Sequence, residues 1–458
     1  MKKYSIFIIF ISTFYLSSCK KYLDKVPDSR LTIPTEINDL QYLLNFVSFM
    51  NVGAPELPDY STDNVLYSFT SWQGFVVNQL RNSYICSKDI FQGETSIDWN
   101  YGYRTIYYSN VVLDGLSNLK NLPKDQQYNT TKAHALFFRA LTFFNLQDQF
   151  GQPYDQNTSD HDLSIVLRLT PDLTAKVQRS TVKETYDQII KDLNTALILL
   201  PNDFNLKIPT LPGKPAVYAL LARVYLTMQN YEQAGSNADS SLKLYSTLCD
   251  YNTINASQTY PLSRKQNVEV LFENNQRSSG NINLSIDTAL YNSYDKNDLR
   301  KIMFFRTGTN GSVLYQGSYG NLSGNPSNGL TTDEMYLIRA ETRARSGDQS
   351  SAMDDLNALL VKRWAIDKVT GLTLYKNRTS SSAEDALKQI LVERRKELIY
   401  RGLRWSDLRR LNKDPRFAKT LTRSLNGQIY TLPPNNSRYA FPIPIQEIQL
   451  TGIPQNNR

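Results

Sequence analysis

Histidine and cysteine are scarce in this chain, which has 2 histidines and 3 cysteines in 458 residues. The histidines, His134 and His161, and the widely separated cysteines do not supply the closely spaced ligand pairs that zinc sites need. The sequence also lacks the HExxH, CxxC, GxGxxG, GxxxxGK(S/T) and GxSxG motifs, which position metals, phosphates or an activated serine. We therefore expect no metal, no cofactor and no catalytic residue.

Long apolar runs are also absent, and disorder-promoting residues are few. Glycine (20) and proline (19) are too few for a disordered or collagen-like chain, and 41% hydrophobic residues are enough to bury a core. The most apolar segment, residues 6–16, is much shorter than the roughly 20 residues that span a bilayer. The sequence therefore predicts a folded protein that no helix anchors across a membrane.

The first residues have the pattern of a secretory signal. Lys2 and Lys3 precede the apolar stretch 6–16, and two serines then precede Cys19. The letters LSSC resemble a bacterial lipobox, in which the peptide is cut before the cysteine and the cysteine is acylated. We predict that residues 1–18 are a lipoprotein signal peptide and that Cys19 is the lipidation site, so the membrane is reached through a lipid anchor only. The alternative is an ordinary cleaved signal with an incidental cysteine.

The charge is mildly basic, with 51 lysines and arginines against 43 acids and a formal net charge of +8. It becomes +6 when residues 1–18 are removed, because Lys2 and Lys3 are lost. The short basic clusters are mixed with acids or lie in helical patterns, unlike the basic stripe of a nucleic-acid-binding protein. We expect no nucleic-acid partner.

Two cysteines remain beside the predicted lipidation site. Cys86 and Cys249 are far apart in the sequence and could pair in an oxidising compartment. We favour two separate buried thiols over a disulfide.

Helical periodicity predicts a mainly α scaffold built from pairs of helices. The pairs cover about residues 101–149, 181–244, 332–364 and 382–411. The individual helices are expected at 101–119, 132–149, 181–200, 215–228, 231–244, 332–346, 349–364, 382–400 and 404–411. Ser180 or Thr181 is the expected N-cap of the third helix, which we pair with the fourth, and Glu184 lies in its first turn.

Small residues recur where paired helices must approach closely. Ala222 is followed twelve residues later by Ala234, and Ala340 is followed twelve residues later by Ala352. Both stretches resemble tetratricopeptide units, although the copies lie 118 residues apart and do not form a tandem array. The alternative is two chance alanine-rich helical hairpins.

Two insertions, residues 50–98 and 247–330, lack a sustained helical period and are rich in Asn, Ser, Gly and Tyr. Loops of this length are uncommon and tend to be functional. Aromatic rings among polar side chains suit a sugar, although they equally suit a protein partner or simple packing. The predicted ligand-binding residues are Trp72, Tyr60, Tyr67, Tyr315 and Tyr319.

Trp72 is the leading candidate among these residues. Tryptophan offers the largest stacking face, and Trp72 lies in the polar stretch SFTSWQGF. Trp99, Trp364 and Trp405 lie in helical patterns, and we expect them in the core.

The C-terminal third carries a family pattern. It reads ILVERRKELIYRGLRWSDLRRL at 390–411 and IYTLPPNNSRYAFPIPIQEIQLTGIPQNN at 429–457. These stretches resemble the SusD/RagB family of outer-membrane nutrient-binding lipoproteins of the Bacteroidetes type. Three further short motifs match the family pattern: Trp99-x3-Tyr103-x2-Ile106-x3-Asn110, Arg139-Ala140 and Asp298-x-Arg300. One position departs from the pattern: the family usually has an acidic residue directly before the glycine, whereas this chain has Arg401 before Gly402.

The resemblance implies one SusD-like domain over residues 19–458, with helical repeats that carry long irregular insertions. It implies a lipid-anchored protein of the outer membrane, facing the cell surface, that captures an oligosaccharide and delivers it to a SusC-type TonB-dependent transporter. The alternatives are an oligopeptide-binding lipoprotein on the same kind of transporter and, more weakly, a glycan-degrading enzyme.

The acids of the family motif decide between binding and catalysis. Glu393 and Glu397 lie four residues apart on one helical face, beside Arg394 and Arg404. A glycosidase needs two carboxyls across a cleft, about 5–9.5 Å apart and one with a raised pKa. Because nearby cations lower the pKa of a carboxyl, we expect a structural ion-pair network instead.

Overall fold

The computed structural model describes residues 36–118, 124–276, 284–308, 311–317, 319 and 325–458. The predicted signal peptide and Cys19 lie outside these residues. In the part of the chain that is described, no helix combines the length and the apolarity that crossing a membrane requires.

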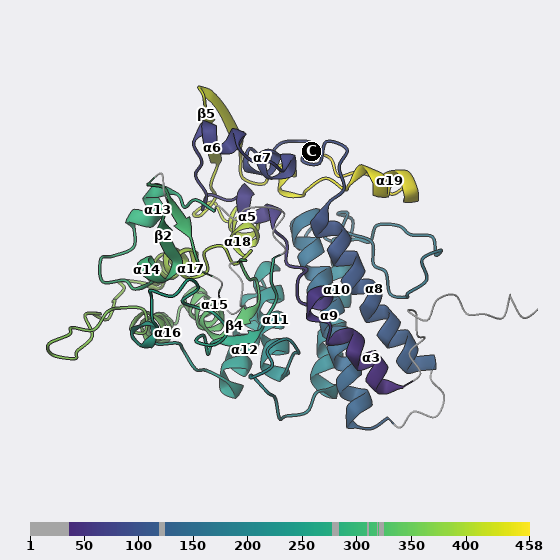
Figure 1. Ribbon diagram of the computed structural model, residues 1–458, viewed down its shortest axis with the longest axis horizontal. Helices are drawn as coiled ribbons and strands as arrows, with labels where there is room; N and C mark the ends of the chain where they lie inside the picture. Colours follow the sequence, from purple (N-terminus) through teal and green to yellow (C-terminus); the bar gives the residue numbers. More distant parts are fainter. Residues whose placement is uncertain (1–35, 119–123, 277–283, 309–310, 318, 320–324) are drawn as a thin grey trace, which may run out of the picture.

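Three long helices form one side of the molecule (Figure 1). They are α8 (Ile97–Asn118), α9 (Gln126–Phe150) and α10 (Val182–Leu199). The middle helix, α9, packs against both of the others, which explains why it is buried along most of its length. Thr181, one of the two predicted N-caps, caps α10 and forms a capping box with Glu184 of the first turn. The short helices α3 (Ile37–Leu44) and α4 (Val47–Met50) cover α8.

The remaining repeat helices follow in a second group. They are α11 (Lys214–Thr227), α12 (Tyr231–Leu244), α15 (Thr332–Arg345), α16 (Gln349–Leu360) and α17 (Ala383–Glu397). Helix α11 packs on α12, α12 on α15, and α15 on both α16 and α17. Ala222, Ala234, Ala340 and Ala352 are all fully buried, so their small side chains allow the close approach that the repeat pattern predicts. The mainly α, tetratricopeptide-like fold is thus confirmed.

One predicted pairing is wrong and a second is only part of the packing. Helix α10 packs on α11 as predicted, but it packs more extensively on α9. Helix α17 packs on α15 rather than on α18 (Arg404–Leu411). Between α17 and α18 the chain turns at Tyr400 and Gly402, which have φ of 52° and 67°. These left-handed residues redirect α18 toward α5 and α11.

The two insertions fold into short elements that contact each other and that we call the insertion layer. Isolated β-bridges connect them, from Ala54 to Gln276 and from Val65 to Ile286. The first insertion contains α5 (Leu57–Ser61), α6 (Phe69–Gln73) and α7 (Asn78–Tyr84). The second contains η2 (Tyr251–Thr253), β1 (Val270–Phe272), α13 (Thr288–Asn292), α14 (Arg300–Phe304), β2 (Phe305–Thr307), β3 (Val313–Tyr315) and β4 (Leu330–Thr331). Of these elements, α5, α6, α13 and β2 lie in the upper left part of Figure 1, and β4 lies lower, beside α11 and α15.

Each described sheet has only two strands. Strand β1 pairs with β4, β2 with β3, and β5 (Leu421–Leu425) with β6 (Gln428–Leu432), all antiparallel. Asn426 and Gly427 form the tight turn of the last hairpin with φ of 49° and 81°, as this turn type requires. The chain then continues through η3 (Ser437–Tyr439) to α19 (Ile445–Thr451).

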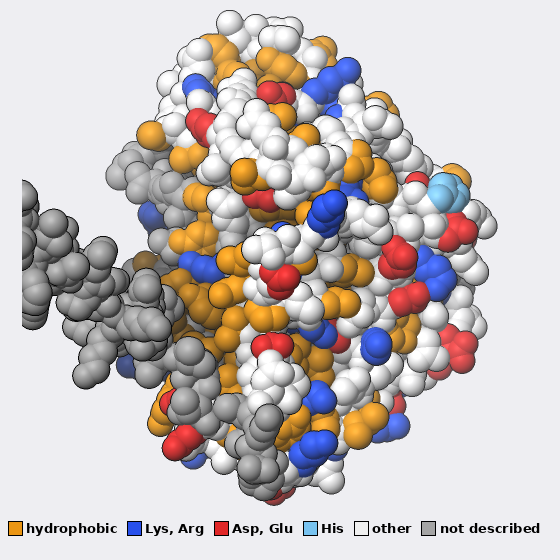
Figure 2. Space-filling model, turned by 90° about the vertical axis from the view of Figure 1, so that its right-hand side faces the viewer, with side chains coloured by type: hydrophobic (Ala, Val, Ile, Leu, Met, Phe, Trp, Pro, Cys, Tyr) orange, Lys and Arg blue, Asp and Glu red, His pale blue; other side chains and the backbone are white. Residues whose placement is uncertain are grey.

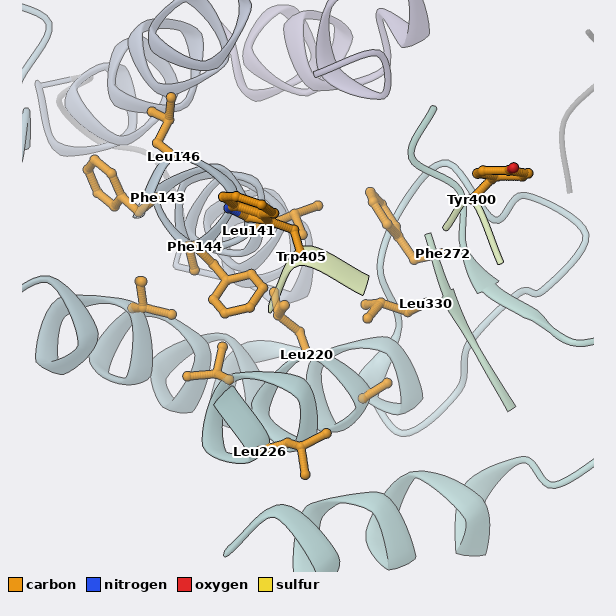
Figure 3. Close-up of a cluster of buried hydrophobic side chains, with 14 of the residues drawn as sticks. Leu141, Phe143, Phe144, Leu146, Leu220, Leu226, Phe272, Leu330, Tyr400 and Trp405 are labelled. Carbon is orange, nitrogen blue, oxygen red and sulfur yellow. The ribbon is translucent and has the colours of Figure 1, made fainter. Parts of the chain in front are cut away.

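The main core lies where the helices meet the insertion layer (Figure 3). Leu141 and Phe144 of α9, Leu220 of α11, Phe272 of β1 and Trp405 of α18 contribute to it. A smaller core fills the space between α15, α16 and α17. The packed helices therefore provide a rigid base for the insertion layer.

Candidate ligand-binding site

Helix α6 presents Trp72 at the surface of the insertion layer. The helix begins where Ser68 accepts a hydrogen bond from the backbone N–H of Ser71 at 3.1 Å. The indole N–H donates to the carbonyl of Arg81 at 3.0 Å, and the Trp72 ring lies 5.9 Å from the ring of Phe69. Trp72 is half-buried, so the ring has a fixed orientation and an exposed part.

Buried aromatic rings support this surface from below. The half-buried Phe75 meets the rings of Tyr67 and Tyr60 edge-on, with centroid distances of 4.9 and 5.7 Å. Tyr67 in turn lies edge-on to Tyr84 at 5.1 Å. These four rings thus form one packed aromatic layer, and Trp72 and Phe69 pack against the same main core.

The structure contradicts the prediction that four tyrosines are stacking platforms. Tyr60, Tyr67, Tyr315 and Tyr319 are only 1%, 6%, 4% and 1% exposed. A ligand cannot reach a ring face that other side chains already cover, so these four residues belong to the core. The sequence does not distinguish them from Trp72, because aromatic residues in a polar loop can point either way.

Tyr319 has the most polar surroundings of the four tyrosines. Its hydroxyl lies within hydrogen-bonding distance of the carboxylates of Glu269 and Asp333. The guanidinium of Arg401 lies 4.0 Å above its ring and donates to the carbonyl of Ser327 at 2.9 Å. Arg401, the departure from the family pattern, is therefore accommodated by a ring and backbone oxygens.

The acids of the family motif form a buried ion-pair network, as predicted. Arg300 donates to Glu393 at 2.6 Å and to Glu397 at 3.0 Å, and Glu397 also accepts from Arg363 at 2.7 Å. Burial opposes ionisation of Glu393, but Arg300, Lys396 and Arg378 outweigh it and lower its pKa to about 2. Burial dominates at Glu397, whose pKa is raised. Both carboxylates are about 1% exposed, so no substrate reaches them.

The rest of the motif ties the C-terminal segment to distant parts of the chain. Arg404 donates to Asp63 of the first insertion at 2.8 Å, and Arg410 donates to Glu341 of α15 at 2.6 Å. Arg394 binds Asp407 at 2.9 Å. The motif therefore locks the repeats to the first insertion.

Other predictions concern buried side chains. Cys86 and Cys249 are free and buried, which confirms two separate thiols. Trp99, Trp364 and Trp405 are 3%, 8% and 1% exposed and lie in the core as expected. Within the described ranges, no three of the His, Cys, Asp and Glu side chains lie close enough to hold a metal ion.

Sequence reasoning missed a cleft of about 330 Å³ beside α8. Its lining includes Trp99, Tyr103, Ile106 and Asn110, the residues of the family piece near the start of this helix. These residues are four, three and four positions apart in the sequence, so they lie on one face of the helix. This spacing is the sequence feature that could have indicated the cleft. The partner segments, 166–177 and the C-terminal end, are too far away in sequence to be predicted.

Comparisons with known proteins cover most of the chain. Residues 21–226 match the family model described as "Starch-binding associating with outer membrane", and residues 332–457 match the model described as "SusD family". A SusD-like protein P2 of Formosa agariphila is 30% identical over 148 residues, which are 32% of this chain and 26% of that protein. The chain thus spans about a quarter of the length of this curated relative.

Solved structures share the whole fold. A putative sugar binding protein of Bacteroides vulgatus has a TM-score of 0.72 at 23% identity, covering 93% of this chain and 99% of its own. A SusD superfamily protein of Bacteroides thetaiotaomicron has a TM-score of 0.70 at 22% identity, covering 92% of this chain and 100% of its own. The two family models together with this shared fold show that the chain belongs to the SusD/RagB family.

Proposed function

We propose that the protein is a cell-surface lipoprotein that captures a glycan without cleaving it and delivers it to a SusC-type TonB-dependent transporter. The observation that carries the proposal is the Trp72 surface, set on a packed aromatic layer within a SusD/RagB fold. The names of similar structures, which include a sugar binding protein, support the choice of a glycan.

The chemistry around Trp72 suits a sugar. A pyranose has an apolar C–H face that stacks on an indole and hydroxyls that need hydrogen-bonding partners. Ser68, Ser71 and Gln73 are exposed beside Trp72 and offer hydroxyl and amide groups. Because Phe69 and the bond to Arg81 already hold the indole in place, binding orders few further side chains.

The buried acids support binding rather than hydrolysis. Burial raises the pKa of Asp59 to about 7, a value that would suit a general acid. Asp59 is only 1% exposed, however, and Gln276 donates to its carboxylate at 2.6 Å. A glycosidase needs such a group at a cleft that its substrate enters.

The calorimetric titration of a Trp72→Ala variant tests the site. A glycan array first identifies the ligand, with a peptide library as the second arm. Loss of the stacking face should weaken binding by roughly 1–3 kcal/mol with little change in thermal stability. Val76→Ala is the matched control, because Val76 is 96% exposed on the same surface and offers no ring. Wild-type affinity in a folded Trp72→Ala protein would remove Trp72 from the site, and selective binding of peptides would favour the oligopeptide alternative.

The lipid anchor at Cys19 has its own test. Cys19→Ala should move the protein from the membrane fraction to the soluble fraction, because several acyl chains on one residue provide the attachment. Immunoblots of fractionated cells measure this change. An unchanged membrane fraction would contradict the proposed anchor.

The helical scaffold offers a surface for the transporter. Tyr42 and Phe46 of the α3 and α4 region are 69% and 53% exposed. Beside them, Arg104 lies 4.1 Å from the ring of Phe49 and 4.0 Å from the ring of Tyr101. Aromatic residues and arginine are the types that interfaces enrich. The wild-type protein should co-purify with a SusC-type barrel in mild detergent, and a Tyr42→Glu/Phe46→Glu variant should release it.

A further inference from the structure

The cleft beside α8 lies on a different side of the molecule from Trp72. Three parts of the chain enclose it: α8, the segment 166–177 and the end of α19 with the residues after it. Helices α8 and α19 lie at the right of Figure 1, whereas α6 lies at the upper left. Figure 2 looks onto the side that carries α8, where apolar side chains run between single charged ones.

Hydrogen bonds hold the walls of the cleft together. The Tyr103 hydroxyl donates to the carbonyl of Val166 at 2.9 Å and accepts from its N–H at 3.0 Å. The Asn110 amide donates to the carbonyl of Arg168 at 2.9 Å, and its oxygen accepts from Arg139 at 2.9 Å. Arg139 forms a buried ion pair with Asp192 at 2.8 Å. The cleft is therefore a built part of the scaffold and not a gap between loose loops.

Several polar groups around this cleft have unused hydrogen-bonding capacity. Among the described residues, the Asn100 amide, the Tyr107 hydroxyl and the Glu447 carboxylate form no side-chain hydrogen bond within the protein. Arg168 uses one N–H, which donates to the carbonyl of Asp172 at 3.1 Å. The half-buried rings of Tyr103 and Tyr107 lie along the same helical face.

This combination indicates the class of ligand. Ring faces suit the C–H face of a sugar, and the amide, hydroxyl, carboxylate and guanidinium groups suit its hydroxyls. Arg168 and Glu447 have opposite charges, which disfavours a strongly charged ligand and favours a neutral one. A volume of about 330 Å³ is at the lower end of the range for ligand pockets and fits a short saccharide.

We propose that this cleft binds a short neutral segment of the glycan and acts as a second sugar site, independent of Trp72. The proposal rests on the proposed function, since it takes the ligand to be a glycan. Two separate sites on one lipoprotein would hold a long chain more tightly than either site alone, provided that the chain spans both sites.

The test compares the wild-type protein with Trp72→Ala, two cleft variants and one control variant by calorimetry. The probes are neutral tetrasaccharides of glucose, mannose, xylose and galactose, and a longer polymer of whichever sugar binds. Tyr107→Ala removes a ring face, and Glu447→Gln removes the charge at almost constant shape. Val369→Ala is the control, because Val369 is 94% exposed between α16 and α17 and does not line the cleft. Thermal melts establish that each variant is folded.

The wild-type protein should bind the tetrasaccharide at two sites. Tyr107→Ala should lower the affinity of one site at least about fivefold, Glu447→Gln should weaken the same site, and Trp72→Ala should affect only the other. Wild-type stoichiometry and affinity in both cleft variants would overturn the second site and leave the proposed function intact. If Trp72→Ala binds normally while Tyr107→Ala does not, the cleft is a sugar site and Trp72 is not. Failure of the wild-type protein to bind any glycan would overturn both.

Discussion

The buried arginine at the centre of the ion-pair network makes the sharpest stability prediction. Arg300 is fully buried and binds Asp298 at 2.7 Å, Glu393 at 2.6 Å and Glu397 at 3.0 Å. The substitution Arg300→Met keeps much of the side-chain volume but removes the charge that these three carboxylates share. Glu397 keeps Arg363, and Glu393 keeps Lys396, whereas Asp298 keeps only the more distant Lys396 at 3.5 Å.

The cations that the three carboxylates keep in the variant limit the size of the destabilisation. Breaking a buried ion pair by removing one partner costs about 3–5 kcal/mol, because a buried charge is left without its partner. A chain of this length unfolds with an entropy of roughly 1 kcal/mol per degree, so the melting temperature should fall by about 3–5 °C. Differential scanning calorimetry measures the change.

The pH dependence of the loss identifies its cause. In the variant, protonation of the carboxylates relieves the repulsion that Arg300 no longer offsets, so the loss of stability should be smaller at pH 5 than at pH 8. Lys183→Met is the control, because the Lys183–Asp187 pair is 58% exposed on both sides and should change the melting temperature little. A loss below about 1 °C, or one that is equal at both pH values, would refute the reasoning.

Two further predictions concern other buried positions. Burial raises the folded-state pKa of Asp59 from 3.8 to about 7. The protonated group contributes fully to the free energy of unfolding below pH 3.8, and this contribution falls by about 1.4 kcal/mol per pH unit as the pH rises toward 7. The Asp59→Asn side chain does not ionise, so the melting temperature of this variant minus that of the wild-type protein should rise from pH 5 to pH 8. An equal difference at both pH values would contradict the raised pKa. At Gly329 a Cβ atom would lie 2.3 Å from the carbonyl oxygen of Phe272, so Gly329→Ala should destabilise the protein by about 1–3 kcal/mol in a urea titration. Gly53→Ala, whose Cβ would lie 3.6 Å from Thr105, should be nearly neutral, and equal effects of the two substitutions would count against the clash.

The helices could be predicted from the sequence because their signals are local. The apolar period and the capping box at Thr181 locate α10 to within a residue at each end. Pairing of helices is not local, as α10 shows by packing more extensively on α9 than on α11. Its apolar face fits α9 as well as α11, and only the path of the intervening chain decides between them.

The candidate site was harder to predict, because exposure is a property of the folded layer. Tyr60 and Trp72 lie in the same insertion with similar polar neighbours, yet Tyr60 is 1% exposed and Trp72 is half-buried. The cleft depends on even more distant parts, since Tyr103 and Glu447 meet across more than 300 residues. The arginines and acids of the C-terminal motif predict a buried ion-pair network, but most of their partners are distant, as Arg300 with Glu393 and Arg404 with Asp63 show.

The contacts of Asp63 have a consequence for the order in which the chain folds. This carboxylate binds Arg404 at 2.8 Å and Lys419 at 2.9 Å, across more than 300 residues of sequence. Helical hairpins such as α11 with α12 close short loops and can form before the rest of the chain has been synthesised. These two ion pairs cannot form until about the last eighth of the chain, which begins at Arg404, is present. A chain stopped before Arg404 would therefore keep its local hairpins but expose the aromatic layer around Tyr67, which is the kind of surface that chaperones and proteases recognise.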